Sequence, residues 1–461
     1  MNYAKDGGRY MRTIVHKLDF YVKSEDIFEQ YKNRKMAVFL DSSLENQLGQ
    51  FSIIGLEPYL ILKEEDGVFY KNDEPQFETF EFGMKKALQK YQEKNPTKLP
   101  LVSGAIGYFS YDYGRKFEHI STRHPKKIHM PEAMFAFYDF LIIDDKKEKA
   151  LYITARGETK DAETAITELE KEIKSCNLSL KPPKKYQLAL FSPNFTKEDY
   201  KKAIEKMISY IIEGDIYIAN MTQQLKIYSQ KEPYDVYRYL RVYNPSPFGV
   251  FFQGGDYQIA CASPERFLQV KNGNIETRPI KGTRKRGETK KEDLQLKLEL
   301  QQSSKDRSEL LMIVDLERND LNHVCEPGSV IVTEHFAVET YATVFHLVTT
   351  IIGKMKKTIQ TTDLIEATFP GGSITGAPKI RSMEIIDELE HDRRNLYTGS
   401  IGYFSFNGDC DFNIVIRTAV YQNDTYYIGV GGGITCESDS EFEYEETLQK
   451  AKAILEAIGD E

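Results

Sequence analysis

The dipeptide Asn272-Gly273 constrains the fold most directly, because it predicts a two-residue turn between two strands of a β-hairpin. The residues on both sides of the pair form plausible strands. Counting outward from the turn places Glu265 opposite Ile280. Glu265 and Lys281 are therefore expected to be diagonal neighbours at the open end of the hairpin.

Lys281 ends the second strand and precedes Gly282, so its amine can face a site instead of packing. A lysine becomes nucleophilic when burial or a cationic neighbour lowers its pKa, and a nearby carboxyl group can protonate a leaving group. The alternative is a surface ion pair between Glu265 and Lys281, which contributes tenths of a kcal/mol to about 1 kcal/mol. Catalysis requires that the rest of the chain form a pocket around this pair.

The chain has 461 residues, so one large composite fold or two domains is expected. Its net charge of −9 argues against nucleic acid as the main partner. No apolar stretch is long enough to cross a bilayer, and the first residues lack the apolar core of a signal peptide. We therefore expect no membrane association and a cytoplasmic location. The five scattered cysteines predict neither a disulfide framework nor a zinc site.

The chain divides into three predicted regions: an N-terminal tail at 1–12, a sheet-rich region at 13–180, and a longer region at 190–461. Short apolar runs between turn signals in the second region predict strands of a mostly antiparallel sheet. They are followed by a charged helix at 159–174, and the proline-containing segment 180–185 is the best candidate linker.

The third region is predicted to open with an amphipathic helix that Thr196 caps and that runs to Gly214. The residues after this helix mix strands and helices without another clear break. Neither a short-period repeat nor a low-complexity tract is present.

Two pairs of carboxylates occur at helical spacing. Asp306 and Glu309 lie three residues apart and share a helix face, and so do Glu443 and Glu446. Two such faces brought together would offer four oxygen ligands, which suits a hard cation such as Mg²⁺. Acidic residues at this spacing more often mark a solvated helix face, and Glu445 lies on a different side from Glu443.

Two glycine-rich segments suggest close approach of a ligand to the backbone. The loop 371–376 precedes a predicted helix, with Pro378 suited to the first turn, and N–H groups at such a position attract anions. The loop matches neither common nucleotide-binding pattern, so a carboxylate ligand fits as well. The run 429–433 permits close approach or forms a structural bulge. Arg417, in a predicted strand, and Lys450 are cations that suit a dianionic substrate, although each alone is more often a surface charge.

Taken together, these segments resemble the chorismate-utilising enzymes, and they look most like the aminodeoxychorismate synthase component I branch, a close relative of anthranilate synthase component I. The resemblance is dense from Phe195 onward and weaker from Thr13 to Lys174. Six motifs carry it: Ser263-Pro-Glu-Arg-Phe, Pro279-Ile-Lys-Gly-Thr, Met312-Ile-Val-Asp-Leu-Glu-Arg-Asn-Asp-Leu, Pro370-Gly-Gly-Ser-Ile-Thr-Gly-Ala-Pro-Lys, Gly399-Ser-Ile-Gly-Tyr and Gly431-Gly-Gly-Ile.

The resemblance implies an α+β fold, a large two-sheet α/β sandwich of the anthranilate synthase component I type, with the active site in the cleft between the sheets. The region 190–461 is then the chorismate-binding catalytic region. Glu265 matches the general acid that protonates the departing C4 hydroxyl of chorismate, and Lys281 matches a nucleophile that attacks C2. The implied Mg²⁺ ligands are Glu309 and Glu446, supported by Asp306 and Glu443. The implied substrate-binding residues are Tyr397, Arg417, Gly432, Gly433, Lys450, Thr375 and His346.

Lys281 separates the two nearest branches, because the anthranilate synthases resemble this motif with alanine at that position. The lysine implies conversion of chorismate and ammonia to 4-amino-4-deoxychorismate, for p-aminobenzoate and folate synthesis, with Mg²⁺-assisted loss of the C4 hydroxyl. Isochorismate and salicylate synthases fit less well, since Ile218 aligns near their water-activating lysine. Ile218 also departs from the glutamine that is common there in the amino-transferring branches.

None of the cysteines lies in the Gly-x-Cys-x-Gly elbow of a glutaminase, so the resemblance implies that a separate glutaminase subunit delivers the ammonia. Two alternatives remain. The first is anthranilate synthase component I, with Ser42 roughly where that family binds tryptophan. The second is a module of the same fold that binds a carboxylated ligand without turnover.

Overall fold

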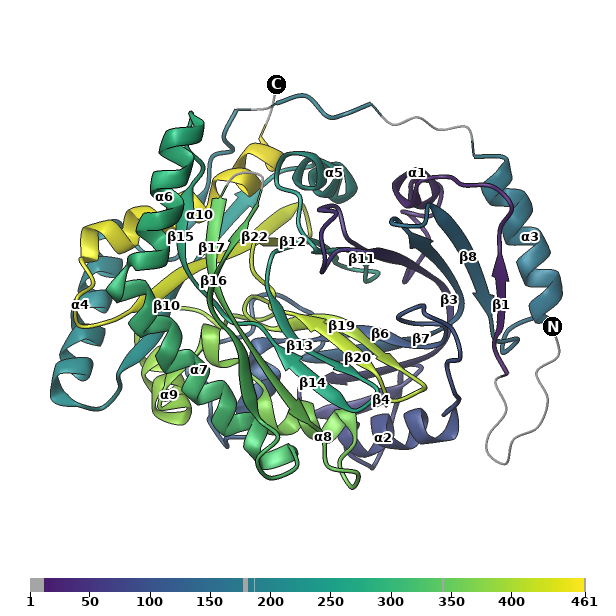
Figure 1. Ribbon diagram of the computed structural model, residues 1–461, viewed down its shortest axis with the longest axis horizontal. Coiled ribbons are helices and arrows are strands. Elements are labelled where there is room, and N and C mark those ends of the chain that lie inside the picture. Colours follow the sequence, from purple (N-terminus) through teal and green to yellow (C-terminus); the bar gives the residue numbers. More distant parts are fainter. Residues whose placement is uncertain (1–11, 177–180, 186, 342–343, 460–461) are drawn as a thin grey trace.

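The computed structural model describes residues 12–176, 181–185, 187–341 and 344–459. All but the last residue of the predicted tail 1–12, and the first residue of the predicted linker 180–185, lie outside the described residues. The described strands pair into one continuous antiparallel network that folds into two layers (Figure 1).

The first layer contains eleven strands, each paired with the next. Their order is β9 (Ser192–Pro193), β10 (Ile218–Tyr228), β22 (Thr425–Ile434), β21 (Thr418–Gln422), β12 (Gln258–Ser263), β11 (Phe248–Gln253), β2 (Val38–Asp41), β3 (Phe51–Glu65), β7 (Ala133–Asp145), β8 (Ala150–Ala155) and β1 (Ile14–Lys17). A short strand, β18 (Gly376–Ala377), also pairs with the start of β10.

The second layer shares β3 and β7 with the first. Its order is β5 (Glu74–Pro75), β4 (Val68–Lys71), β3, β7, β6 (Gly104–Phe109), β19 (Ser400–Ser405), β20 (Cys410–Asn413), β13 (Arg266–Lys271), β14 (Asn274–Thr277) and β17 (Val344–Lys354). Two further strands, β15 (Ile280–Lys285) and β16 (Ile331–Thr340), also pair with β17.

The long strands β3 and β7 join the two layers. Their outer ends pair at residues 51–56 with 140–145 in the first layer, and at 60–64 with 133–137 in the second. The register shifts between Pro58 and Leu60, and Glu57 has a φ of 54°. Such an irregularity bends a strand and lets it change sheets. The core between the layers therefore includes side chains from both, among them Val38, Ile53, Tyr108, Phe252 and Tyr403.

Helices cover the outer faces of both layers (Figure 1). The first layer is covered by α1 (Ser24–Glu29), α3 (Ala162–Lys174), α5 (Pro233–Tyr243) and α10 (Ser440–Ile458). The second is covered by α2 (Phe80–Lys90), α6 (Lys290–Gln302), α7 (Ser304–Val324) and α8 (Thr361–Thr368). A smaller core forms where α4 (Lys197–Glu213) and α9 (Lys379–Leu389) pack against β10. Two short 3₁₀ helices are η1 (Tyr111–Lys116) and η2 (Gly372–Ile374). The predicted α+β fold, a two-sheet sandwich with helices outside, is confirmed.

Several local predictions are confirmed. The Asn-Gly turn pairs Lys271 with Asn274, as the hairpin register requires. Thr196 caps α4 through its side chain, and Gly214 ends the helix with a φ of 87°. Strands from the regions 13–180 and 190–461 also pair with each other, at β2 with β11 and at β6 with β19.

The strand prediction for Arg417 is wrong, because Arg417 does not lie in a strand. β20 ends at Asn413, and Arg417 occupies a bend with a φ of 51° before β21. The apolar run after Asn413 suggested a continuous strand. In the structure, the Ile414 carbonyl instead accepts a hydrogen bond from the Ser263 hydroxyl (2.6 Å), and the Ile414 N–H donates to the Glu265 carbonyl (3.0 Å).

Candidate functional site

The prediction that Lys281 ends the second strand of the hairpin is wrong, because β14 ends at Thr277. Lys281 instead lies near the start of β15, where it pairs with Leu347 of β17. Its Nζ atom donates a hydrogen bond to the Ser373 carbonyl at 3.1 Å. Burial lowers the pKa of the Lys281 amine, and the nearby carboxylates of Glu309 and Glu265 oppose that shift. The amine therefore lies in a partly desolvated site, which is the environment that activates a lysine nucleophile.

Gly282 permits the backbone geometry beside this lysine. It has a φ of 74°, and the strand register shifts between Lys281 and Thr283. A Cβ added at Gly282 would meet the Asp306 side chain at 2.8 Å. The glycine thus allows β15 to approach α7 closely.

Glu265 lies between β12 and β13 with 6% of its surface exposed. Burial raises the pKa of its carboxyl group. The Ser373 hydroxyl, the Lys281 charge and the Ile280 N–H all act in the opposite direction. The hairpin register predicted that Glu265 and Lys281 would be neighbours, and the structure places them within electrostatic reach of each other. The regular pairing of β13 with β14 ends at Gln269 and Glu276, before it reaches Glu265 and Ile280.

Ser373 contacts both residues, although no role was predicted for it from the sequence. Its carbonyl accepts from Lys281 while its hydroxyl bonds to Glu265. The available signal was a polar side chain inside the glycine loop 371–376, where Ser373 lies within η2. The loop thus forms hydrogen bonds to both the carboxyl group of Glu265 and the amine of Lys281.

The two acidic pairs lie on α7 and α10. Burial raises the pKa values of Glu309 and Glu443, and the negative charge of Glu443 adds to the shift at Glu309. Asp306 forms an ion pair with Arg284 at 2.9 Å, and Glu446 forms one with Lys450 at 2.9 Å. The Glu443 carboxylate accepts a hydrogen bond from the Ser438 hydroxyl at 2.7 Å. Glu309 of α7 and Glu446 of α10 both raise the pKa of the Lys281 amine, so both helices place negative charge near it.

Within the described part of the chain, no group of three or more His, Cys, Asp or Glu side chains is arranged to hold a metal ion. Mg²⁺ commonly needs only one or two protein carboxylates, with water and substrate oxygens at the other positions. Glu309 suits such a role, because it is 13% exposed and its nearest cation, Lys305, is 4.0 Å away. The oxygen donors of Glu309 and Glu446 thus fit a hard divalent cation.

Four of the predicted substrate-binding residues lie around this cluster. Burial lowers the pKa of the Arg417 guanidinium, while Tyr341 and Glu265 raise it. Lys450 donates to the Gly431 carbonyl at 2.8 Å. A Cβ at Gly432 would meet Glu443 at 3.2 Å and Lys450 at 3.5 Å, and a Cβ at Gly433 would meet Lys281 at 3.2 Å. The glycine run on β22 therefore allows the cations to lie close to the backbone.

His346 and Thr375 are both buried near the cluster. The Nδ1 atom of His346 lies 3.0 Å from the Thr283 hydroxyl, and its Nε2 atom is buried without a hydrogen-bond partner. Burial, followed by the charge of Arg417, lowers the pKa of His346 to about 3, so the ring is neutral. The Thr375 hydroxyl donates to the Gly371 carbonyl at 2.9 Å and so fixes the glycine loop.

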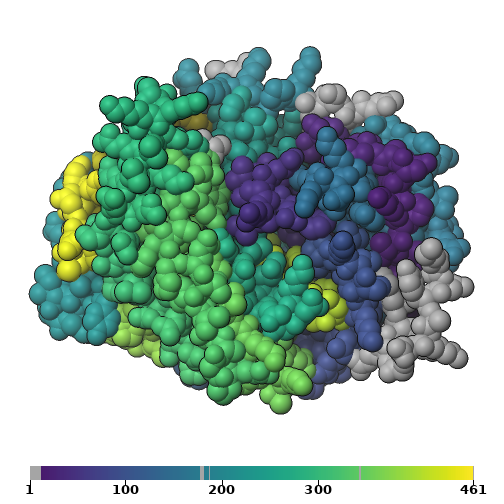
Figure 2. Space-filling view, viewed as in Figure 1, coloured from purple at the N-terminus to yellow at the C-terminus, as the bar shows by residue number. Residues whose placement is uncertain are grey.

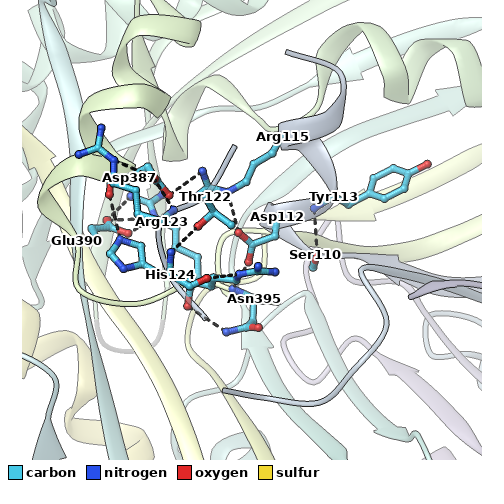
Figure 3. A network of polar contacts seen from close by, with 12 residues as sticks. Ser110, Asp112, Tyr113, Arg115, Thr122, Arg123, His124, Asp387, Glu390 and Asn395 are labelled. Atoms are coloured by element: carbon cyan, nitrogen blue, oxygen red, sulfur yellow. Dashed lines mark hydrogen bonds and ion pairs between the residues drawn. The ribbon is translucent and has the colours of Figure 1, made fainter. Parts of the chain in front are cut away.

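Tyr397 lies in the turn between α9 and β19, and its ring packs against Gly429 of β22. A polar network anchors the segment that leads to it (Figure 3). Asp112 accepts hydrogen bonds from Arg115 at 2.8 Å and from the Asn395 N–H at 2.8 Å, and Arg115 also pairs with Asp387 at 3.0 Å. Residues of η1 thereby position a segment almost 300 residues away.

A separate cavity of about 1180 Å³ lies between the two layers. Ser42, Pro247, Arg266 and Tyr403 are among its lining residues, whereas none of the predicted catalytic or metal-binding residues lines it. Figure 2 shows the hollow between the segment around residue 45, in purple, and the hairpin of β13 and β14, in teal. None of the helices in the described ranges is long and apolar enough to span a membrane.

The chain is similar to several characterised proteins. Aminodeoxychorismate synthase component 1 of Bacillus subtilis (strain 168) is 37% identical over 442 residues, which cover 93% of this chain and 92% of that protein. Anthranilate synthase component 1 of Aquifex aeolicus is 36% identical over 425 residues, covering 88% and 85%. The crystal structure of anthranilate synthase component I from Streptococcus pneumoniae superposes with a TM-score of 0.81 at 31% identity, covering 89% of this chain and 93% of that one.

The family model for chorismate binding enzymes matches residues 41–456. The match spans both layers of the sandwich and every residue of the site described above. The resemblance that the sequence motifs indicated is confirmed, and this chain belongs to the family of chorismate binding enzymes.

Proposed function

We propose that this chain catalyses the aminodeoxychorismate synthase component 1 reaction, in which chorismate and ammonia give 4-amino-4-deoxychorismate for p-aminobenzoate and folate synthesis. The observation that carries the proposal is the pair of half-buried Lys281 and buried Glu265, which both contact Ser373. The lowered pKa of the amine favours a free nucleophile, and the raised pKa of the carboxyl group favours a proton donor.

In the first step, the free amine of Lys281 forms a bond to C2 of chorismate. Both ring double bonds shift by one position, and the C4 hydroxyl leaves as water with a proton from Glu265. In the second step, ammonia forms a bond to C4, both double bonds shift back, and the C2–Nζ bond breaks. Lys281 is thereby regenerated, and the proton released by the attacking ammonia restores the acid.

The remaining residues bind and orient the substrate. The cations Arg417 and Lys450 pair with its carboxylates, and Gly432 and Gly433 let it approach the backbone. Neutral His346 and Thr375 line the pocket, and Tyr397 supports β22 from the side. Glu309 and Glu446 would hold Mg²⁺, with Asp306 and Glu443 in support, and the ion would polarise the ring carboxylate and the leaving hydroxyl.

The ammonia is proposed to come from a separate glutaminase subunit, because no glutaminase cysteine motif is present in the sequence. The curated relatives named component 1 support this, since that name implies a second component. We further propose that the pair works in the cytoplasm.

Product identification tests the proposed reaction. The purified chain is incubated with chorismate, Mg²⁺ and ammonium, and the product is identified by chromatography and mass spectrometry. We expect 4-amino-4-deoxychorismate. Anthranilate as the sole product would assign the chain to the other amino-transferring branch, which the Aquifex relative represents. Chorismate that binds but is returned unchanged would reduce the chain to a binding module.

A further inference from the structure

Glu317 is a buried carboxyl group that the reaction proposed above does not use. It lies on the face of α7 that packs against the second layer, in series with Leu310, Ile313, Val314 and Leu321. Only 9% of its surface is exposed. An acid on an otherwise apolar helix stripe is costly unless it is hydrogen-bonded or neutral.

The hydrogen bonds around Thr277 fix the position of one proton. The Thr277 Oγ1 atom lies 2.6 Å from the Phe267 carbonyl and 2.9 Å from Oε2 of Glu317. A hydroxyl has a single proton, and a carbonyl can only accept, so the Thr277 proton goes to Phe267. The contact between Thr277 and Glu317 then needs a proton from the carboxyl group. Glu317 is therefore the donor in its bond to Thr277.

The charges that face Glu317 agree with a protonated carboxyl. Glu265 and Asp320 are both acidic, and each raises the pKa of Glu317. The cation on this side, Lys379 of α9, pairs with Asp320 at 2.6 Å and donates to the Thr368 carbonyl at 3.0 Å. Burial is the largest cause of the shift, which brings the pKa of Glu317 to about 8.

Glu317 is also linked to the two segments that hold the proposed catalytic pair. Phe267, whose carbonyl Thr277 binds, lies in β13, two residues after Glu265. On the other side, a Cβ at Gly372 would meet the Glu317 side chain at 3.5 Å. The next residue, Ser373, contacts both Glu265 and Lys281. A change of charge at Glu317 would thus affect both the hairpin that follows Glu265 and the glycine loop that contains Ser373.

We infer that Glu317 is a positioning residue held as a neutral carboxylic acid, which donates to Thr277 and keeps a second negative charge away from Glu265. The inference rests on the proposed function only for the role of Glu265. When Glu317 loses its proton, the bond to Thr277 loses its donor and a negative charge appears beside the proposed acid. Both effects oppose turnover.

Infrared difference spectroscopy tests the protonation state without any need for activity. Spectra of the wild-type chain and Glu317→Gln are compared near neutral pH and above the pKa of about 8. We expect a protonated carboxyl band in the wild type that is absent from Glu317→Gln and disappears at alkaline pH. Absence of that band at neutral pH would overturn the inference. This result is separate from the product assay, so failure of the proposed function would leave the spectroscopic answer intact.

Turnover measurements test the positioning role. Glutamine is neutral and can donate to Thr277, so Glu317→Gln is expected to stay within about threefold of wild type at neutral pH. Glu317→Leu is neutral without a donor and is expected to lose about fivefold to tenfold in kcat. The ratio of kcat for Glu317→Gln to wild type should rise with pH through about 8, because effects of other groups cancel in the ratio.

Thr277→Ser retains the hydroxyl and provides the matched control, with a wild-type pH profile expected. A ratio that stays flat through the same pH range would contradict the positioning role, as would a Glu317→Leu variant with wild-type kcat. Stability gives a further readout. A raised carboxyl pKa means that the folded chain binds more protons than the unfolded chain between about pH 4.5 and about pH 8, so wild-type stability falls across that window. Glu317→Gln should therefore gain stability relative to wild type as the pH rises.

Discussion

The Nζ atom of Lys281 lies 3.2 Å from the position that a Cβ on Gly433 would occupy. The strand β22 therefore passes close to the amine, and Ile218 lies 3.4 Å from the same position. Glycine at 433 sets how far the amine can reach across the site. It does so without a φ in the left-handed region.

Gly433→Ala is expected to displace the Lys281 amine by a few tenths of an ångström and to lower kcat/KM about tenfold. The fold should be unchanged, because the added methyl group meets the far end of a flexible side chain. Steady-state kinetics measures the effect, and circular dichroism checks the fold. Wild-type kcat/KM in this variant would show that the close approach has no catalytic role.

Lys281→Ala should greatly slow the chemical step while leaving chorismate binding mostly intact, because the carboxylate contacts come from Arg417, Lys450 and the glycine segments. Some anthranilate can emerge, since the site then resembles anthranilate synthase. Single-turnover kinetics separates binding from chemistry. Lys285→Ala, on the same strand but exposed, is the matched control and should behave as wild type.

The covalent route has a direct test. Mass spectrometry of the wild-type chain with chorismate and Mg²⁺, in the absence of ammonia, should show an adduct on Lys281. If Lys281→Ala forms 4-amino-4-deoxychorismate at the full wild-type rate, Lys281 is not the nucleophile. The lysine would then serve only as an ion-pair partner of Glu265.

Removing the metal, or either of its proposed ligands, should abolish turnover. We expect a chelator to eliminate activity and added Mg²⁺ to restore it, and Glu309→Gln and Glu446→Gln each to lose metal-dependent activity with the fold intact. Glu445→Gln is the control, because Glu445 is 52% exposed and pairs with Lys197 at 3.0 Å. Normal turnover by both ligand variants would reject the metal assignment.

The pH dependence of kcat/KM should be bell-shaped. Burial lowers the pKa of Lys281 from its ordinary 10.5 and raises that of Glu265 from 4.5, so the two values move toward each other. Activity rises with pH as the amine loses its proton and falls as the acid loses its own. In Glu265→Gln, the residual activity should lose the part of the falling limb that belongs to Glu265, and only the fall caused by Glu317 should remain. A falling limb of wild-type shape in that variant would assign it to another group.

The buried ion pair between Arg394 and Glu390 supports the strand beside Gly429. Arg394 also donates to the Ile374 carbonyl at 2.8 Å, and Glu390 accepts from the Thr222 hydroxyl at 2.8 Å. Arg394→Met should destabilise the fold by about 3–5 kcal/mol, because it leaves a buried carboxylate without its partner. Adding Glu390→Leu should recover part of the loss in urea unfolding. A single-variant cost below about 1 kcal/mol would be inconsistent with this account.

Local structure was largely determined by the sequence, wherever a few neighbouring residues carry the signal. Asn272-Gly273 fixed the hairpin register, and Thr196 and Gly214 fixed both ends of α4. The acidic residues at helical spacing do lie on helices, α7 and α10. Such signals depend on backbone conformation within one turn or one helix, which sequence largely dictates.

Arg417 and Glu317 show where local signals fail. The apolar run before Arg417 fits a strand, but hydrogen bonds from Ser263 and to Glu265, about 150 residues away, bend it instead. Glu317 sits at the spacing of a buried helix stripe, a signal that sequence reasoning left unused. Its neutral state depends on Thr277 and Phe267, which no pattern around residue 317 contains.

The site itself was decided by tertiary structure. Lys281, Ser373, Gly433 and Glu446 are spread over 166 positions, and only the pairing of β15, β17, β10 and β22 and the packing of α7 and α10 bring them together. The pKa values of Lys281 and Glu265 follow from that packing, because desolvation and nearby charges are properties of the folded core. Sequence supplies the reactive groups, and burial among distant neighbours gives them their protonation states.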